Sequence, residues 1–90
     1  MGRSHVVNLL KNETGLVARS QAKRVLDGLE RFQEVILDFA GVEGIGQGFA
    51  DEVFRVWPRQ HPDTHLRAEN MTAPVTFMVE RARRAATSAT

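Results

Sequence analysis

The segment from Val35 to Glu52 constrains the fold more than any other part of this chain. Val35–Phe39 is apolar apart from Asp38, which is typical of a central strand covered on both faces. Three glycines then alternate at positions 44, 46 and 48, and an apolar pattern of helical period begins at Phe49. A strand, a turn and a helix in direct succession predict an exposed turn held between two rigid elements, where functional residues often lie.

One predicted helix precedes this segment, and a second begins within it at Phe49. Apolar residues at helical spacing predict a helix over residues 20–32, with Ser20 as its N-cap and Gly28 inside it. The helix that begins at Phe49 should end or kink at Trp57, because Pro58 cannot donate an intrahelical hydrogen bond.

The remaining elements lie toward the two ends of the chain. A short apolar patch at residues 6–10 predicts a first strand, and the more polar segment 64–69, with Leu66 and Ala68 facing inward, predicts another. Thr72 and Pro74 signal the start of a third helix, since a hydroxyl cap and a first-turn proline are both common there. Its buried stripe should comprise Val75, Met78, Val79, Ala82 and Ala86.

The predicted fold is a single α/β domain over residues 5–86, with the order β-α-β-α-β-α. We expect a mixed sheet of about three to four strands with three helices. Residues 1–4 are interpreted as a tag or a disordered N-terminus, and residues 87–90 as a frayed C-terminal tail.

Composition narrows the class of protein further. The 90 residues carry a net charge of +1, no cysteine and no apolar run of the roughly 20 residues that cross a bilayer. We therefore expect a cytoplasmic protein without disulfides, thiolate metal sites or a strongly basic nucleic-acid-binding face. Aromatic residues on the helix from Phe49 leave room for a homodimer.

The glycine turn could in principle cradle a phosphate group at the start of a helix. However, its spacing matches no nucleotide-binding motif, and no Lys, Ser or Thr stands where a nucleotide would need one. The favoured interpretation is that the glycines permit positive φ angles and a close turn.

Three other groups of residues have compositions that could support a chemical site. The carboxylates Asp38, Glu43, Asp51 and Glu52 could form a metal or acid/base site, but a solvated strand end and helix start explain them better. His61 and His65 have a zinc-like spacing that Pro62 interrupts, which favours surface histidines. Lys23, Arg24, Arg81, Arg83 and Arg84 could bind nucleic acid, although a solvated helix face is favoured. The sequence thus predicts no catalytic residue, cofactor or metal ligand.

Several motifs resemble the bacterial STAS-like domain family of unknown function, which is related to the STAS domains of anti-sigma-factor antagonists. They cover residues 16–24, which read LVARSQAKR, residues 37–43, which read LDFAGVE, and the string GQGFADE at 46–52. A His-Pro pair at 61–62 and Asn70 complete the resemblance, which spans about residues 5 to 86. It implies an α/β STAS-like fold and a regulatory module rather than an enzyme.

The resemblance also implies that the glycine turn belongs to a partner-binding surface, and that regulation of this surface differs from that in the antagonists. In the antagonists, a hydroxyl at this turn is phosphorylated by a kinase, and the added charge breaks a partner interface. Here Gln47 stands at the acceptor position, so the resemblance implies that the phosphorylation switch is missing. The implied partner is a regulatory protein, such as a histidine-kinase-like ATPase or a fused or adjacent DNA-binding domain.

We therefore hypothesise a protein interaction surface at the turn and on the exposed face of the following helix. Its predicted residues are Glu43, Gly46, Gln47, Gly48, Asp51, Glu52 and Arg55. Two alternatives from other classes stay open, namely nucleic-acid binding through the basic helix residues and small-ligand or nucleotide sensing at the glycine turn.

Overall fold

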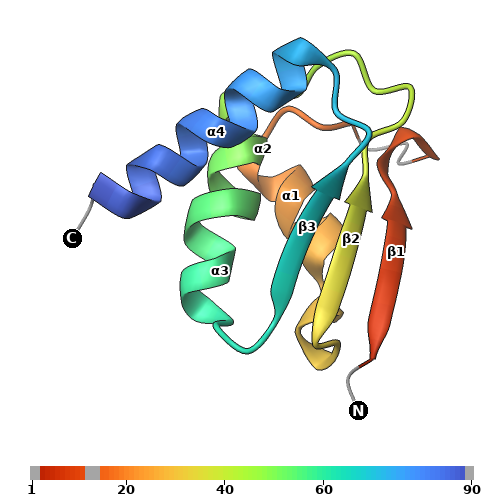
Figure 1. Ribbon diagram of the computed structural model, residues 1–90, viewed down its shortest axis with the longest axis vertical. Coiled ribbons are helices and arrows are strands. Elements are labelled where there is room, and N and C mark those ends of the chain that lie inside the picture. Colours follow the sequence, from red (N-terminus) through yellow and green to blue (C-terminus); the bar gives the residue numbers. More distant parts are fainter. Residues whose placement is uncertain (1–2, 12–14, 89–90) are drawn as a thin grey trace.

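A computed structural model describes residues 3–11 and 15–88 of the chain, and three parallel strands form its sheet in the order β1-β2-β3 (Figure 1). The strands are β1 Ser4–Asn8, β2 Glu34–Asp38 and β3 His65–Glu69. The central position of β2 confirms the prediction from its apolar run. The sheet is entirely parallel rather than mixed, because a helical connection after β1 and after β2 returns the chain to the same end of the sheet.

Helices pack against one face of this sheet, as Figure 1 shows. The longer ones are α1 Arg19–Leu26 and α4 Ala73–Ser88. A composite helix lies between them and consists of α2 Gln47–Asp51, a π-helical turn η3 Glu52–Val56 and α3 Trp57–Gln60. Two short 3-10 turns, η1 Leu9–Lys11 and η2 Leu29–Arg31, complete the described elements. Within the described residues, none of the helices has the length and apolar character needed to cross a bilayer.

The hydrophobic core lies between the sheet and the helices. Val35 and Leu37 of β2 are fully buried there, and the aromatic residues Phe49, Phe54 and Trp57 pack into the same core. These rings are therefore not surface groups that could mediate a homodimer. The prediction that β2 is covered on both faces was wrong, because Glu34, Ile36 and Asp38 alternate with the core residues and point to the opposite, half-exposed face.

The first helix begins earlier and ends sooner than the sequence predicted. Its N-cap is Ala18 rather than Ser20, and the side-chain oxygen of Gln21 accepts hydrogen bonds from the N–H groups of Val17 and Ala18. Gly28 lies beyond its end with a φ of 82°, a left-handed conformation that stops the helix at Leu26. A glycine inside a helical pattern was thus a termination signal.

The composite helix passes through Pro58 instead of ending at Trp57. The N–H of Trp57 donates to the carbonyl of Glu52, five residues earlier, so the turn before the proline is widened. In a regular α-helix the proline ring would clash with the carbonyl four residues before it. The π-helical turn removes that clash, and the helix continues to Gln60.

The last helix agrees with its predicted start and buried stripe. The hydroxyl oxygen of Thr72 accepts a hydrogen bond from the Val75 N–H at 3.4 Å, and Pro74 lies in the first turn. The helix extends to Ser88, so the predicted frayed tail is helical up to that residue, and residues 89 and 90 lie outside the described chain. At the other end Ser4 already belongs to β1, whereas the expectation for residues 1 and 2 falls outside the described residues.

Candidate interaction site

The glycine turn packs tightly against the segment that leads into α1. The Gly46 N–H donates to the Leu16 carbonyl at 2.8 Å, and the Phe49 N–H donates to the Val17 carbonyl at 3.0 Å. A Cβ atom on Gly46 would lie 2.4 Å from the Val17 oxygen, and one on Gly48 would lie 3.2 Å from the nearest backbone nitrogen of this segment. Close backbone approach therefore explains these two glycines.

The predicted positive φ angles occur at other glycines. Gly15, Gly28 and Gly41 have positive φ, whereas Gly46 has a φ of −82° in extended backbone. The Val17 carbonyl oxygen takes the place beside α2 that a bound phosphate oxygen would need, and it accepts one of the N–H groups that would bind it. The turn is closed by the chain itself.

Four charged side chains join α1 to the composite helix. The guanidinium of Arg19 donates to Asp51 at 2.7 Å and to Glu52 at 2.9 Å, and Arg55 donates to the same Asp51 carboxylate at 2.8 Å. Arg55, with help from Arg19, lowers the pKa of Asp51 to about 2. We call Arg19, Asp51, Glu52 and Arg55 the charge network.

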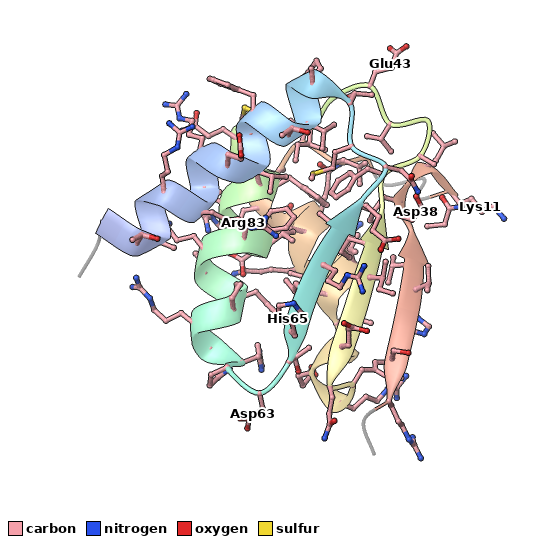
Figure 2. All side chains as sticks on the ribbon, viewed as in Figure 1. Lys11, Asp38, Glu43, Asp63, His65 and Arg83 are labelled. Carbon is pink, nitrogen blue, oxygen red and sulfur yellow. The ribbon has the colours of Figure 1, made fainter. Side chains whose placement is uncertain are left out.

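This network corrects part of the predicted interaction surface. Glu52 is only 3% exposed, so it is not on an exposed helix face, and its charge is satisfied by Arg19. Asp51 and Arg55 are half-buried by their mutual contact. Glu43 and Gln47 are exposed as expected, and Figure 2 shows Glu43 pointing outward from the turn at the carboxyl end of the strands.

A small groove separates α2 from α4 beside the turn. It has a volume of about 70 Å³ and is lined by Gln47 and Asp51 from one side and Met78 and Arg81 from the other. Sequence reasoning missed its α4 wall, because the periodic pattern places Met78 in the core stripe and Arg81 on the wet side, without showing which helix lies opposite.

Two large apolar side chains are exposed on segments that adjoin α2 or belong to α4. Val17 is 67% exposed and adjoins Gly46 through its backbone, and Phe77 is 60% exposed on α4, one helical turn before Arg81. Neither was predicted as a site residue, although an isolated valine in a polar segment and a phenylalanine outside the apolar stripe were visible signals. We define the α2–α4 face as Val17, Gln47, Asp51, Phe77 and Arg81.

The other candidate residues are separated from this face or from one another. Asp38 accepts hydrogen bonds from the Asn70 side chain and the Ala40 N–H, each at 2.9 Å, and these bonds lower its pKa. The ring of His61 lies 4.5 Å from the ring of Trp57, tilted by 36° to it, rather than pairing with His65. No cluster of metal-binding side chains occurs among the residues that the structure describes.

The basic residues are divided between two helices. Lys23 and Arg24 lie on α1, whereas Arg81, Arg83 and Arg84 lie on α4. The composite helix contacts both α1 and α4, and Arg83 stacks over the Phe54 ring of that helix at 5.1 Å. The predicted nucleic-acid patch is therefore not one continuous element.

The chain was compared with protein families, curated proteins and solved structures. Residues 21–76, more than half of the chain, match the family described as a STAS-like domain of unknown function (DUF4325). No curated protein and no solved structure matches the chain. The family match includes the central strand, the closed glycine turn and the charge network except Arg19. The chain belongs to the STAS-like domain family of unknown function.

Proposed function

We propose that this domain is a non-enzymatic regulatory module that binds a protein partner through the α2–α4 face. The observation that carries the proposal is the exposure of Val17, whose backbone packs against Gly46, and of Phe77, which precedes Arg81 by one helical turn; Gln47 and Arg81 line the groove between α2 and α4. Apolar groups surrounded by polar ones are a common composition for transient protein interfaces.

The charge network supports this role by fixing the geometry of the face. Arg19 binds Asp51 and Glu52 together, so the segment before α1, which includes Val17, is held against α2, which carries Gln47. A surface that is rigid before binding loses less conformational entropy when the partner docks. We assign Asp51 mainly a positioning role and Gln47 a direct contact with the partner.

The proposed mode of control follows from Gln47. Its amide offers neutral hydrogen bonds but carries no hydroxyl that could accept a phosphoryl group. The interaction is therefore proposed to be independent of phosphorylation at this turn. A regulatory ATPase of the histidine-kinase-like type, or an adjacent DNA-binding domain, is the proposed class of partner on the basis of the family resemblance.

The experiment combines site-specific photo-cross-linking with a matched pair of variants. A photoreactive amino acid at position 47 should cross-link a regulatory protein in cells of the native host, whereas the same group at the exposed position 27 should not. The purified partner should bind Val17→Asp at least tenfold more weakly than the unsubstituted chain.

The matched control is Val6→Asp on the uncovered face of the sheet. Val6 is 58% exposed, so it undergoes the same chemical change at similar exposure, far from the α2–α4 face. Equal weakening by the two substitutions, or cross-linking from position 27 alone, would contradict the proposal.

A further inference from the structure

One edge of β3 is not paired with another strand among the described residues. The His65 N–H donates to Gln33 and the Glu69 carbonyl accepts from Phe39, so alternate residues of β3 bond to the β2 side. In a parallel ladder the intervening residues direct their N–H and C=O groups the other way. Leu66, whose side chain is buried in the core, and Ala68 therefore turn two donors and two acceptors toward this edge.

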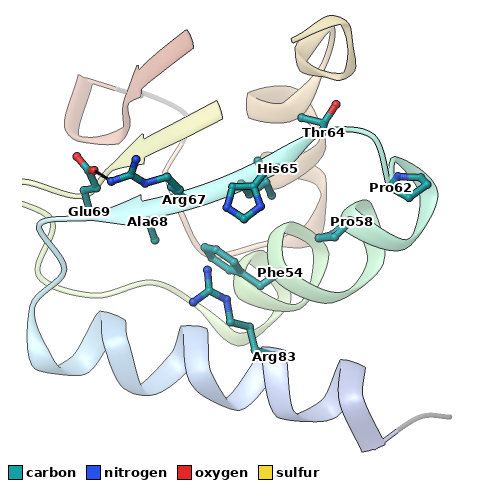
Figure 3. A pocket seen from close by; sticks show the side chains of 10 residues that line it. Phe54, Pro58, Pro62, Thr64, His65, Arg67, Ala68, Glu69 and Arg83 are labelled. Atoms are coloured by element: carbon teal, nitrogen blue, oxygen red, sulfur yellow. Dashed lines mark hydrogen bonds and ion pairs between the residues drawn. The ribbon is translucent and has the colours of Figure 1, made fainter. Parts of the chain in front are cut away.

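This edge lies in an open groove rather than on a flat surface. The groove has a volume of about 590 Å³, and its second wall is made by Phe54 and Pro58 of the composite helix and Arg83 of α4. Figure 3 shows Arg83 reaching from α4 toward β3 along the Phe54 ring, with Ala68 on the facing strand. An exposed edge beside apolar pockets is the geometry that strand addition uses.

The charges in the groove are unbalanced. Its carboxylate, Glu69, is already bound by Arg67 at 2.7 Å. Among the described residues, no carboxylate forms an ion pair with Arg83, whose guanidinium lies 5.1 Å from the centre of the Phe54 ring. The groove therefore complements a ligand that brings a negative charge to Arg83.

We propose that the free edge of β3 binds an extended, acidic peptide segment of a partner protein as an added strand. Backbone hydrogen bonds to Leu66 and Ala68 supply sequence-independent affinity. A carboxylate of the peptide pairs with Arg83, and a small apolar side chain beside it contacts Phe54 and Pro58. This site is separate from the α2–α4 face and does not depend on the function proposed for that face.

A second copy of the chain fits the groove less well than a peptide. Two copies joined in antiparallel fashion, edge to edge through β3, would form one continuous sheet with both helical layers on the same face. Pro58 and Arg83 flank the edge in each copy, so the two sets of helices would meet across the junction. An extended segment without attached helices avoids this contact.

The test begins with a phage-displayed library of random decapeptides selected on the intact chain. The selected peptides should alternate apolar residues and share an Asp or Glu, and a synthetic peptide of that sequence should bind measurably by fluorescence anisotropy. Changing its acid to Lys should weaken binding at least tenfold for the original chain. Arg83→Glu should reverse that preference, whereas Arg24→Glu, the same charge change on α1, should leave it intact.

Hydrogen exchange of backbone amides locates the added strand. The amides of Leu66 and Ala68 should exchange rapidly in the free protein and become protected when the peptide binds. Ala68→Pro removes one outward donor without touching the bonds to β2, and it should reduce peptide affinity at least tenfold while circular dichroism shows retained fold. If that variant unfolds, the hydrogen-exchange measurement and the Arg83→Glu charge reversal decide whether the peptide binds at the edge of β3.

Several results would overturn this proposal. They are failure to select any peptide, selection without an acidic position, protection of amides elsewhere, or a dimer in sedimentation that forms through the β3 edge. Val17→Asp should not change peptide binding, so loss of partner binding at the α2–α4 face and loss of peptide binding at β3 can be told apart.

Discussion

The start of α2 and the free edge of β3 differ in how their polar groups are satisfied. At α2 the Val17 carbonyl accepts the Phe49 N–H, and Arg19 binds two carboxylates. At β3 the outward backbone groups of Leu66 and Ala68 lie along the groove beside the unpaired strand edge. A conspicuous sequence motif thus serves the fold internally, while a strand without any motif leaves its edge unpaired.

The largest effect should come from adding a methyl group where the α2 turn is closed. Gly46→Ala would place a Cβ atom 2.4 Å from the Val17 oxygen, and backbone atoms cannot move aside as a flexible side chain can. We expect a loss of about 3 kcal/mol in the free energy of unfolding, measured by chemical denaturation. Gly44→Ala is the control, because nothing lies within 4 Å of its added methyl group, and it should change stability by less than about 0.5 kcal/mol.

Removing Arg19 from the charge network should have the next largest effect. Arg19→Ala leaves the carboxylate of Glu52 buried without its ion pair, so we expect a loss of about 2 kcal/mol in the free energy of unfolding. Adding Glu52→Gln should recover part of that loss, as a double-mutant cycle would measure. Arg67→Ala breaks exposed pairs on the open sheet face and should cost less than about 1 kcal/mol. Equal losses in the free energy of unfolding from Arg19→Ala and Arg67→Ala would show that the pairs at the start of α2 are no more stabilising than those on the open face of the sheet.

Acid should destabilise the charge network, because Asp51 becomes protonated at low pH. Its pKa falls from 3.8 to about 2 on folding, so its stabilising contribution is complete above pH 4 and is lost as the pH falls toward 2. The stability difference between the original chain and Asp51→Asn should be about 1–2 kcal/mol at pH 5 and should shrink between pH 4 and 2. Denaturant titrations across this range measure it, and a constant difference would contradict the role of Asp51.

The smallest effect on stability should occur at the open edge. Arg83→Ala removes a cation–π contact with Phe54 at a surface position, which should cost about 0.5–1 kcal/mol in the free energy of unfolding. Arg24→Ala on α1 serves as the control, with an expected change below about 0.5 kcal/mol. A loss above about 2 kcal/mol at Arg83 would show that this side chain is part of the fold rather than of an open groove.

Sequence reasoning identified the elements whose signals are local. The central strand, the start of α4 at Thr72 and its buried stripe follow from apolar period and capping chemistry. It placed Gly28 inside a helix that ends before it, and of the two outcomes it offered at Trp57, an end or a kink, the end does not occur. The backbone angle of Gly28 and the π-helical turn before Pro58 depend on how the flanking residues pack. A propensity describes one residue, whereas the backbone conformation at Gly28 and at Pro58 depends on several neighbouring residues together.

The candidate site was less predictable for the same reason. The sequence pointed to Gln47 and the acidic residues after it, but not to the pairing of Arg19 with Asp51 and Glu52, which are more than 30 positions away. It also did not show that Val17 would lie against Gly46, or that Arg81 would line a groove with Gln47. Contacts between distant segments require the tertiary arrangement of the helices.

The contact between Val17 and the start of α2 can also be described as intramolecular binding. The segment of residues 16–19 behaves as a ligand tethered permanently to its receptor, held by the backbone bonds at Gly46 and Phe49 and by the ion pairs of Arg19. Because residues 16–19 belong to the same chain, their contact with α2 is intramolecular, and its occupancy does not depend on the protein concentration.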